Sequence, residues 1–154
     1  MIVYYVKENF DLLHEGYKDF DTYHSIEKTS DADKSQFFKI VDSNLTEKAL
    51  SLPYFIYNHN NGYDINELRA IKEFNDQFIV TGTSRSKENV EFVALAEHRK
   101  YPIIMTQFHP EKLQFEKMSG FLINLSMSHI KFFSAFSRNF FNSGKNAKYL
   151  KPLE

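Results

Sequence analysis

The residues best suited to chemistry lie together in the short run His109-Pro110-Glu111. Pro110 fixes its own φ angle and favours an extended backbone at His109, so the backbone sets the direction of the imidazole. Glu111 lies two residues beyond His109 and can hydrogen-bond one ring nitrogen, which would fix the tautomer and stabilise the imidazolium. A histidine held in this way is suited to act as the general base for a nucleophile.

The alternative interpretation is structural, because a bare His-Pro-Glu run more often packs at a strand end than takes part in catalysis. The segment before the run favours the catalytic interpretation. Residues 102–108 are apolar on both faces, as expected for a buried strand. The ends of such strands are where open α/β sheets present their chemistry.

Several further strands are expected to form the sheet that positions this run. β-branched and aromatic residues predict strands over 2–6, 54–57, 78–83 and 90–97, and a short one around Phe10, Leu12 and Leu13. By composition, residues 27–35 are expected to form a charged surface loop. The run Asn58-His59-Asn60-Asn61-Gly62 is expected to be a second loop.

Three helical regions are expected between and after these strands. Residues 35–50 are helical in part, with a break predicted at Asp42-Ser43-Asn44. A helix over 65–74 would be capped by Asp64, with Glu67 completing a capping box. The last helix would begin at an N-cap Ser128 and end at Gly144, burying an aromatic stripe. The stripe comprises Phe132, Phe133, Phe136, Phe140 and Phe141. This order of elements predicts an α/β or mixed sheet with a C-terminal covering helix.

The motif residues also carry a family resemblance. The run Gln107-Phe108-His109-Pro110-Glu111 is similar to the His-Glu end of the catalytic triad in class I glutamine amidotransferases. Tyr101-Pro102 before it, and Lys112 with Phe115-Glu116 after it, resemble the γ-glutamyl hydrolases more closely. Asn58-His59 with Gly62 resembles the Asn-His-x-x-Gly loop of the same family. The chain is identified as a single γ-glutamyl-hydrolase-like domain over 1–154, family-like over 37–146 and poorly matched over 1–36.

The resemblance implies part of a class I glutamine amidotransferase-like, flavodoxin-like α/β sheet, and a two-step hydrolysis of γ-linked glutamate. In that family a cysteine on a tight strand–helix turn attacks the γ-amide carbonyl, and backbone N–H groups hold the oxyanion. By resemblance, His109 would move the proton, Glu111 would orient His109, and His59 with Asn58 would bind the substrate. The family implies no metal and no organic cofactor. It implies a lysosomal, vacuolar or secreted location, although residues 1–8 do not resemble a signal peptide.

The sequence departs from the family at the nucleophile. It contains no cysteine among its 154 residues and no Gly-x-Ser-x-Gly elbow that could replace one. About half of the family domain is expected to be missing, including strands at the centre of the sheet. Strands that lose their neighbours tend to pair with another chain. We therefore expect either a partner protein that completes the sheet or repair of the exposed edge by residues 1–36, and a γ-glutamyl ligand as a further partner.

Composition excludes other classes of partner. The formal net charge is −1 and acidic and basic residues are interspersed, which gives no support to nucleic-acid binding. The longest apolar runs span only a few residues, so no membrane span is expected. The remaining histidines lack the spacing of metal ligands: His14, His24, His98 and His129.

Three functional hypotheses follow from these observations. The first, which the missing cysteine favours, is a non-catalytic γ-glutamyl-hydrolase-like protein that serves as a structural or binding subunit. The second is part of an active hydrolase whose cysteine elbow lies on a missing segment or on a partner chain. The third is the glutaminase domain of a biosynthetic amidotransferase, against which the Asn58-His59 loop and the Phe115-Glu116 tail argue.

Overall fold

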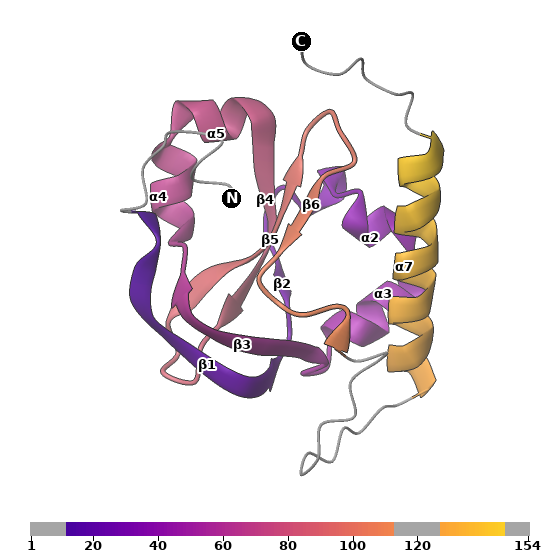
Figure 1. Ribbon diagram of the computed structural model, residues 1–154, viewed down its shortest axis with the longest axis horizontal. Coiled ribbons are helices and arrows are strands. Elements are labelled where there is room, and N and C mark those ends of the chain that lie inside the picture. The colour runs from indigo at the N-terminus through magenta and orange to yellow at the C-terminus, as the bar shows by residue number, and fades with distance from the viewer. Residues whose placement is uncertain (1–11, 113–126, 147–154) are drawn as a thin grey trace.

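The fold is described from a computed structural model, which covers residues 12–112 and 127–146 (Figure 1). The described strands are β1 (His14–His24), β2 (Glu27–Lys28), β3 (Phe55–Gly62), β4 (Phe78–Arg85), β5 (Glu91–His98) and β6 (Ile104–Thr106). The described helices are the 3₁₀-helix η2 (Ala32–Lys34) and the α-helices α2 (Phe37–Ile40), α3 (Ser43–Leu50), α4 (Ile65–Ala70), α5 (Lys72–Gln77) and α7 (Met127–Asn146). The strand predicted at 2–6 and the motif residues Phe115-Glu116 lie outside this range.

The described strands form two sheets. One contains β1 and β3, and the other has the order β2-β4-β5-β6. Every pairing among these strands is antiparallel. The helix α7 runs alongside α2 and α3 on one side of the molecule, whereas α4 and α5 lie on the other (Figure 1). The mixed α/β architecture with a C-terminal covering helix is therefore as predicted.

The strands β4 and β5 confirm the prediction from the two apolar runs. They pair from Phe78↔His98 to Arg85↔Glu91, and almost all of their side chains are buried. The strand β6 differs from its prediction, because it spans three residues and all three are only half-buried. It pairs with β5 on one side and is the edge of its sheet in the described part of the chain, which explains the incomplete burial.

The polar region before residue 63 was interpreted incorrectly. The expected loop at 58–62 continues β3, and β1 pairs with it over His14 to His24, leaving Leu12 and Leu13 outside the strand. The expected loop at 27–35 contains β2 and η2. Both errors have the same cause: partner strands distant in sequence supply the backbone hydrogen bonds, whereas local composition favours turns.

Helix boundaries were predicted in part. The break between α2 and α3 is present, and Asp42 caps α3 by accepting hydrogen bonds from the N–H groups of Asn44 and Leu45. The expected helix over 65–74 is instead two helices that meet at Ile71, where the backbone is extended. Asp64 caps α4 as predicted, but Glu67 pairs with His14 and does not complete a capping box.

An aromatic core joins α7 to the rest of the fold. Phe132 and Phe133 are fully buried and Phe136 nearly so, and the ring of Phe136 lies 4.8 Å from that of Phe37. Burial of each such ring contributes about 1.5–3 kcal/mol. The predicted stripe is too wide, because Phe140 and Phe141 are exposed. The helix also extends past its predicted ends: Ser128 and Gly144 both lie inside it.

No helix within residues 12–112 or 127–146 is both long enough and apolar enough to cross a membrane.

Candidate functional site

The His109–Glu111 pair lies immediately after the end of β6. The N–H of His109 donates to the carbonyl of Ile56 on β3 at 2.9 Å, which ties this strand end to the neighbouring sheet. Nδ1 of His109 lies 2.8 Å from Oε1 of Glu111, the contact expected from the two-residue spacing. The His109 side chain is 34% exposed and that of Glu111 58% exposed, so both groups are open to solvent or to a ligand.

The charge on Glu111 is stabilised by its surroundings. Partial burial by itself would raise the pKa of its carboxyl, but the residue's own backbone N–H and the His109 imidazole outweigh this and lower the pKa. Glu111 is therefore ionised near neutral pH and accepts the hydrogen bond from His109. This arrangement places the proton of the ring on Nδ1 and leaves Nε2 available as a base.

The residues His59 and Asn58 lie next to each other on β3 but face opposite sides. Successive side chains of a strand alternate between its faces, and here Asn58 is exposed whereas His59 is half-buried. The His59 ring packs edge-on against Phe92, with the ring centroids 4.9 Å apart. The structure therefore does not bring Asn58 to the same face as His59.

His59 and His109 lie within electrostatic reach of each other. Burial is the main cause of the lowered pKa of His59, and the positive charge of His109 lowers it further. The two residues are linked through β3, because His109 bonds to Ile56 and the Gln107 side chain donates to the carbonyl of Asn61. Of the four predicted site residues, His59, His109 and Glu111 are thus gathered around β3, and Asn58 points away from them.

Gly62, the last residue of the Asn-His-x-x-Gly run, has a packing role. A Cβ atom at this position would lie 2.8 Å from Cγ of Tyr17 on β1, closer than real Cβ contacts. The missing side chain therefore lets the Tyr17 ring pack over the β1–β3 pair. This glycine is accounted for by the structure of the sheet without reference to a ligand.

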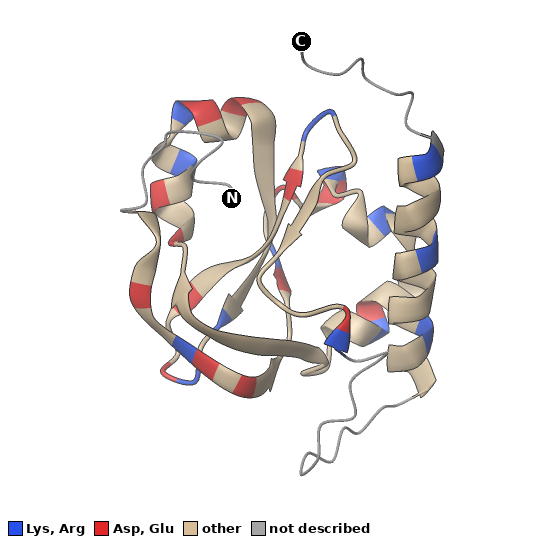
Figure 2. Cartoon of the chain, viewed as in Figure 1, with Lys and Arg blue, Asp and Glu red and all other residues tan. Residues whose placement is uncertain are grey.

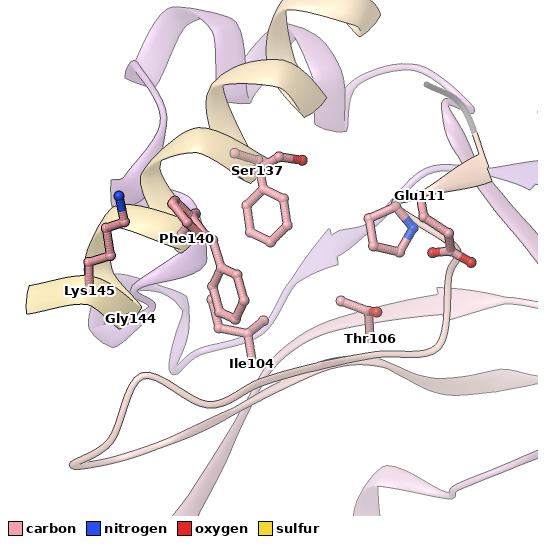
Figure 3. A pocket seen from close by; sticks show the side chains of 10 residues that line it. Ile104, Thr106, Glu111, Ser137, Phe140, Gly144 and Lys145 are labelled. Carbon is pink, nitrogen blue, oxygen red and sulfur yellow. The ribbon is translucent and has the colours of Figure 1, made fainter. Parts of the chain in front are cut away.

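A cavity of about 690 Å³ opens beside the His109–Glu111 pair, between β6 and α7 (Figure 3). Its wall is mainly apolar and includes Ile104, Pro110, Phe136 and Phe140. The Glu111 carboxylate lies at one end of this wall, and the Lys145 side chain lies at the other (Figure 3). A ligand or chain segment that entered this space would meet one side of the His109–Glu111 pair.

Two buried carboxylates were missed from the sequence. Glu97 on β5 is 1% exposed, and Asp19 on β1 is fully buried. Glu97 lies in the otherwise apolar run 92–97. An acidic residue at such a position is expected to be buried and hydrogen-bonded, so the sequence did contain a signal for it. Asp19 lies in a run with no clear periodicity, so only the pairing of β1 with β3 reveals its burial.

Three of the remaining histidines, His14, His98 and His129, make contacts within the fold. His14 contacts Glu67 at 2.5 Å, and Nδ1 of His98 accepts hydrogen bonds from the N–H groups of Lys100 and Tyr101. His129 is 2% exposed and stacks on Tyr54. Within residues 12–112 and 127–146, no group of three or more histidine, aspartate or glutamate side chains could hold a metal ion.

Comparison with known protein families gives a match. The protein-family model described as glutamine amidotransferase class-I matches residues 20–126, which include His59, His109 and Glu111. No curated protein sequence matches the chain.

Proposed function

Because the chain belongs to the class I glutamine amidotransferase family, we propose that it is a γ-glutamyl-hydrolase-like protein that binds γ-glutamyl compounds without hydrolysing them on its own. In this proposal the whole chain, 1–154, is one domain of a larger assembly. One observation carries the proposal: a hydrogen-bonded His109–Glu111 pair is retained in a sequence that has no cysteine. A thiolate nucleophile is therefore absent from these 154 residues, while the groups that would serve it are in place.

The γ-glutamyl specificity rests on the resemblance of two motifs. The segments 101–112 and 58–62 resemble those of γ-glutamyl hydrolases, and His59 would hold the substrate. The position of His59 supports this assignment, because it lies within electrostatic reach of the partly exposed His109. Because Asn58 lies on the opposite face of β3, His59 is the binding residue in this part of the site.

A binding measurement tests the ligand class. Calorimetry with γ-glutamyl-glutamate should give a saturable signal, and α-glutamyl-glutamate, which has the same composition and charge, should bind more weakly. The substitution His59→Gln should reduce the affinity about tenfold or more, as expected for the loss of a hydrogen bond to a charged group. His14→Gln is the matched control, because it removes a surface histidine whose ring bonds to Glu67 and is not part of the proposed site.

Equal affinity for the two dipeptides, or no binding of either, would contradict the γ-glutamyl assignment. Release of glutamate by the purified chain alone would contradict the non-catalytic part of the proposal.

A second candidate is an active hydrolase that obtains its cysteine from another chain. The intact His109–Glu111 pair favours it, because Nε2 of His109 remains available as a base. The strand β6 offers a sheet edge for a partner, and the apolar cavity lies beside it. The test is to purify the native protein, determine its intact mass and identify every co-purifying chain. A tightly bound chain with a Gly-x-Cys-x-Gly elbow, and γ-glutamyl hydrolysis that is lost in His109→Ala, would support this candidate.

A further inference from the structure

Asp19 and His59 lie directly opposite each other in the β1–β3 pair. Opposed residues of an antiparallel pair project to the same face, with Cβ atoms about 4.5–5.5 Å apart. β1 carries several acidic residues (Figure 2), but Asp19 alone among them is fully buried. The sheet therefore places a buried carboxylate against the histidine assigned to the substrate.

The backbone around Asp19 is irregular on both sides. The register of β1 against β3 shifts between Glu15 and Asp19, and again between Asp19 and Thr22. Asp21, within the second shift, has a φ angle of 50°, in the left-handed region. Bulges of this kind change the direction of a side chain and are frequent beside active sites.

The hydrogen bonds of Asp19 account for one carboxylate oxygen only. Oδ1 contacts Nε2 of His24 at 3.0 Å and accepts from the N–H of Lys87 at 3.2 Å. Oδ2 is buried and has no hydrogen bond to the described residues. Both ring nitrogens of His59 are buried as well, and the ring interacts with the backbones of Tyr17 and Asn61. Buried polar atoms are rarely left unpaired, so Oδ2 of Asp19 is a candidate partner for the His59 ring on the same face.

Four groups act on the charge of His59. Burial lowers its pKa, the Asp19 carboxylate opposes this from β1, and the backbones of Tyr17 and Asn61 act in the same direction as Asp19. The His109 imidazole, beyond β6, lowers the pKa. Asp19 is the one carboxylate among these groups. It also contacts His24 on its own strand.

We propose that Asp19 is the positioning residue of His59, which orients the ring and favours its protonated form for an anionic ligand. The site would then contain two histidine–carboxylate pairs, His59 with Asp19 and His109 with Glu111. The ligand class that this arrangement fits is a small carboxylate-bearing compound, since a protonated imidazole donates from both nitrogens. The inference rests on the proposed function for the assignment of His59 to the ligand, but the Asp19–His59 coupling can be measured without any ligand.

The test is an NMR titration of the histidine rings in the full chain, with the His59 signal assigned from His59→Gln. Asp19→Asn keeps the size of the side chain and removes its charge, so the pKa of His59 should fall. Asp21→Asn is the matched control: it removes a charge two residues away and tolerates the same φ angle. It should leave the His59 titration unchanged. In the unsubstituted protein, the Asp19 carboxyl carbon should show an inflection at the His59 midpoint.

The proposal is overturned if Asp19→Asn is folded and moves the titration of His24 but not of His59. It is also overturned if the Asp19 carboxyl signal in the unsubstituted protein shows no inflection at the His59 midpoint, a measurement that does not require any variant to fold. A shifted His59 titration in a protein that binds no γ-glutamyl dipeptide would support the coupling and count against the proposed function.

Discussion

The carboxylate of Glu97 on β5 accepts a hydrogen bond from the hydroxyl of Ser35, 62 residues earlier in the chain. Glu97 also accepts from the N–H groups of Gln36 and Phe37, at 2.6 and 3.2 Å, and from the hydroxyl of Thr81 at 2.9 Å. A buried carboxylate with four donors satisfies the first N–H groups of α2, which have no partner within the helix. The sheet β4–β5 is thereby joined to α2 through one side chain.

Replacing Glu97 with glutamine should destabilise the fold by about 2–4 kcal/mol. An amide offers one accepting oxygen in place of two and introduces a buried donor, so several of the four donors lose their partner. Chemical denaturation measures the change in the free energy of unfolding. Glu91→Gln, on the same strand but less buried, is the control and should change that free energy by less than about 0.5 kcal/mol. Equal effects of the two substitutions would show that the cap contributes nothing.

The pKa of Glu111 should respond to His109. Because the folded-state pKa is lowered, the associated stability is present above the unfolded pKa and is lost as pH falls through the folded pKa. In His109→Gln the pKa of Glu111 should rise toward its ordinary value, since both the hydrogen bond and the charge of the imidazole are removed. An NMR titration of the Glu111 carboxyl carbon measures this. An unchanged titration would mean that the backbone N–H alone holds the carboxylate ionised.

His129 should make the fold sensitive to acid. Burial lowers its pKa to about 4, so between the unfolded value and this value only the unfolded chain binds the proton. Stability should therefore fall as pH decreases through that window, by at most about 3 kcal/mol. The variant His129→Phe retains the ring and its stacking on Tyr54 but cannot titrate, so its stability should depend less on pH. His14→Gln should retain the pH dependence of the unsubstituted protein; denaturation series at several pH values compare the three.

The aromatic core should depend on the buried part of α7 only. Phe132 is fully buried and its ring lies 5.8 Å from that of Phe37, so Phe132→Ala should cost about 3–5 kcal/mol. Phe141 on the same helix is 62% exposed, and Phe141→Ala should cost less than about 1 kcal/mol. Thermal or urea denaturation measures both. A large effect at Phe141 would mean that this ring packs in solution against a surface that the structure leaves open.

The elements that the sequence predicts well are those whose signal is local. The apolar runs of β4 and β5, the Asp42 cap and the His109–Glu111 spacing can all be recognised within a few residues. β1 fails this criterion because its buried positions are Tyr17, Asp19 and Thr22, two of them polar, and its register shifts disturb the alternation. Its assignment depends on the pairing with β3, which composition cannot show.

The candidate site divides in the same way. The sequence predicts that His109 and Glu111 are in contact, because two residues on either side of a proline have little freedom. It does not predict that Asn58 faces away from His59, because a loop does not impose alternation and a strand does. Nor does it predict the Asp19–His59 opposition, which arises only from the register of two strands.

The strand pairings also bear on the order of events during folding. β1 can pair only after β3 has been synthesised, and β2 only after β4. The hydrogen bond from His109 to Ile56 joins residues that the whole β4–β5 hairpin separates in the sequence. Chains dominated by such distant contacts reach the native state slowly, because loop closure costs entropy before the contacts stabilise it. During synthesis the His59 and His109 rings would be made at separate times. Until β3 and β4 are available, β1 and β2 lack their partner strands, so this protein would be most exposed to mispairing at that stage.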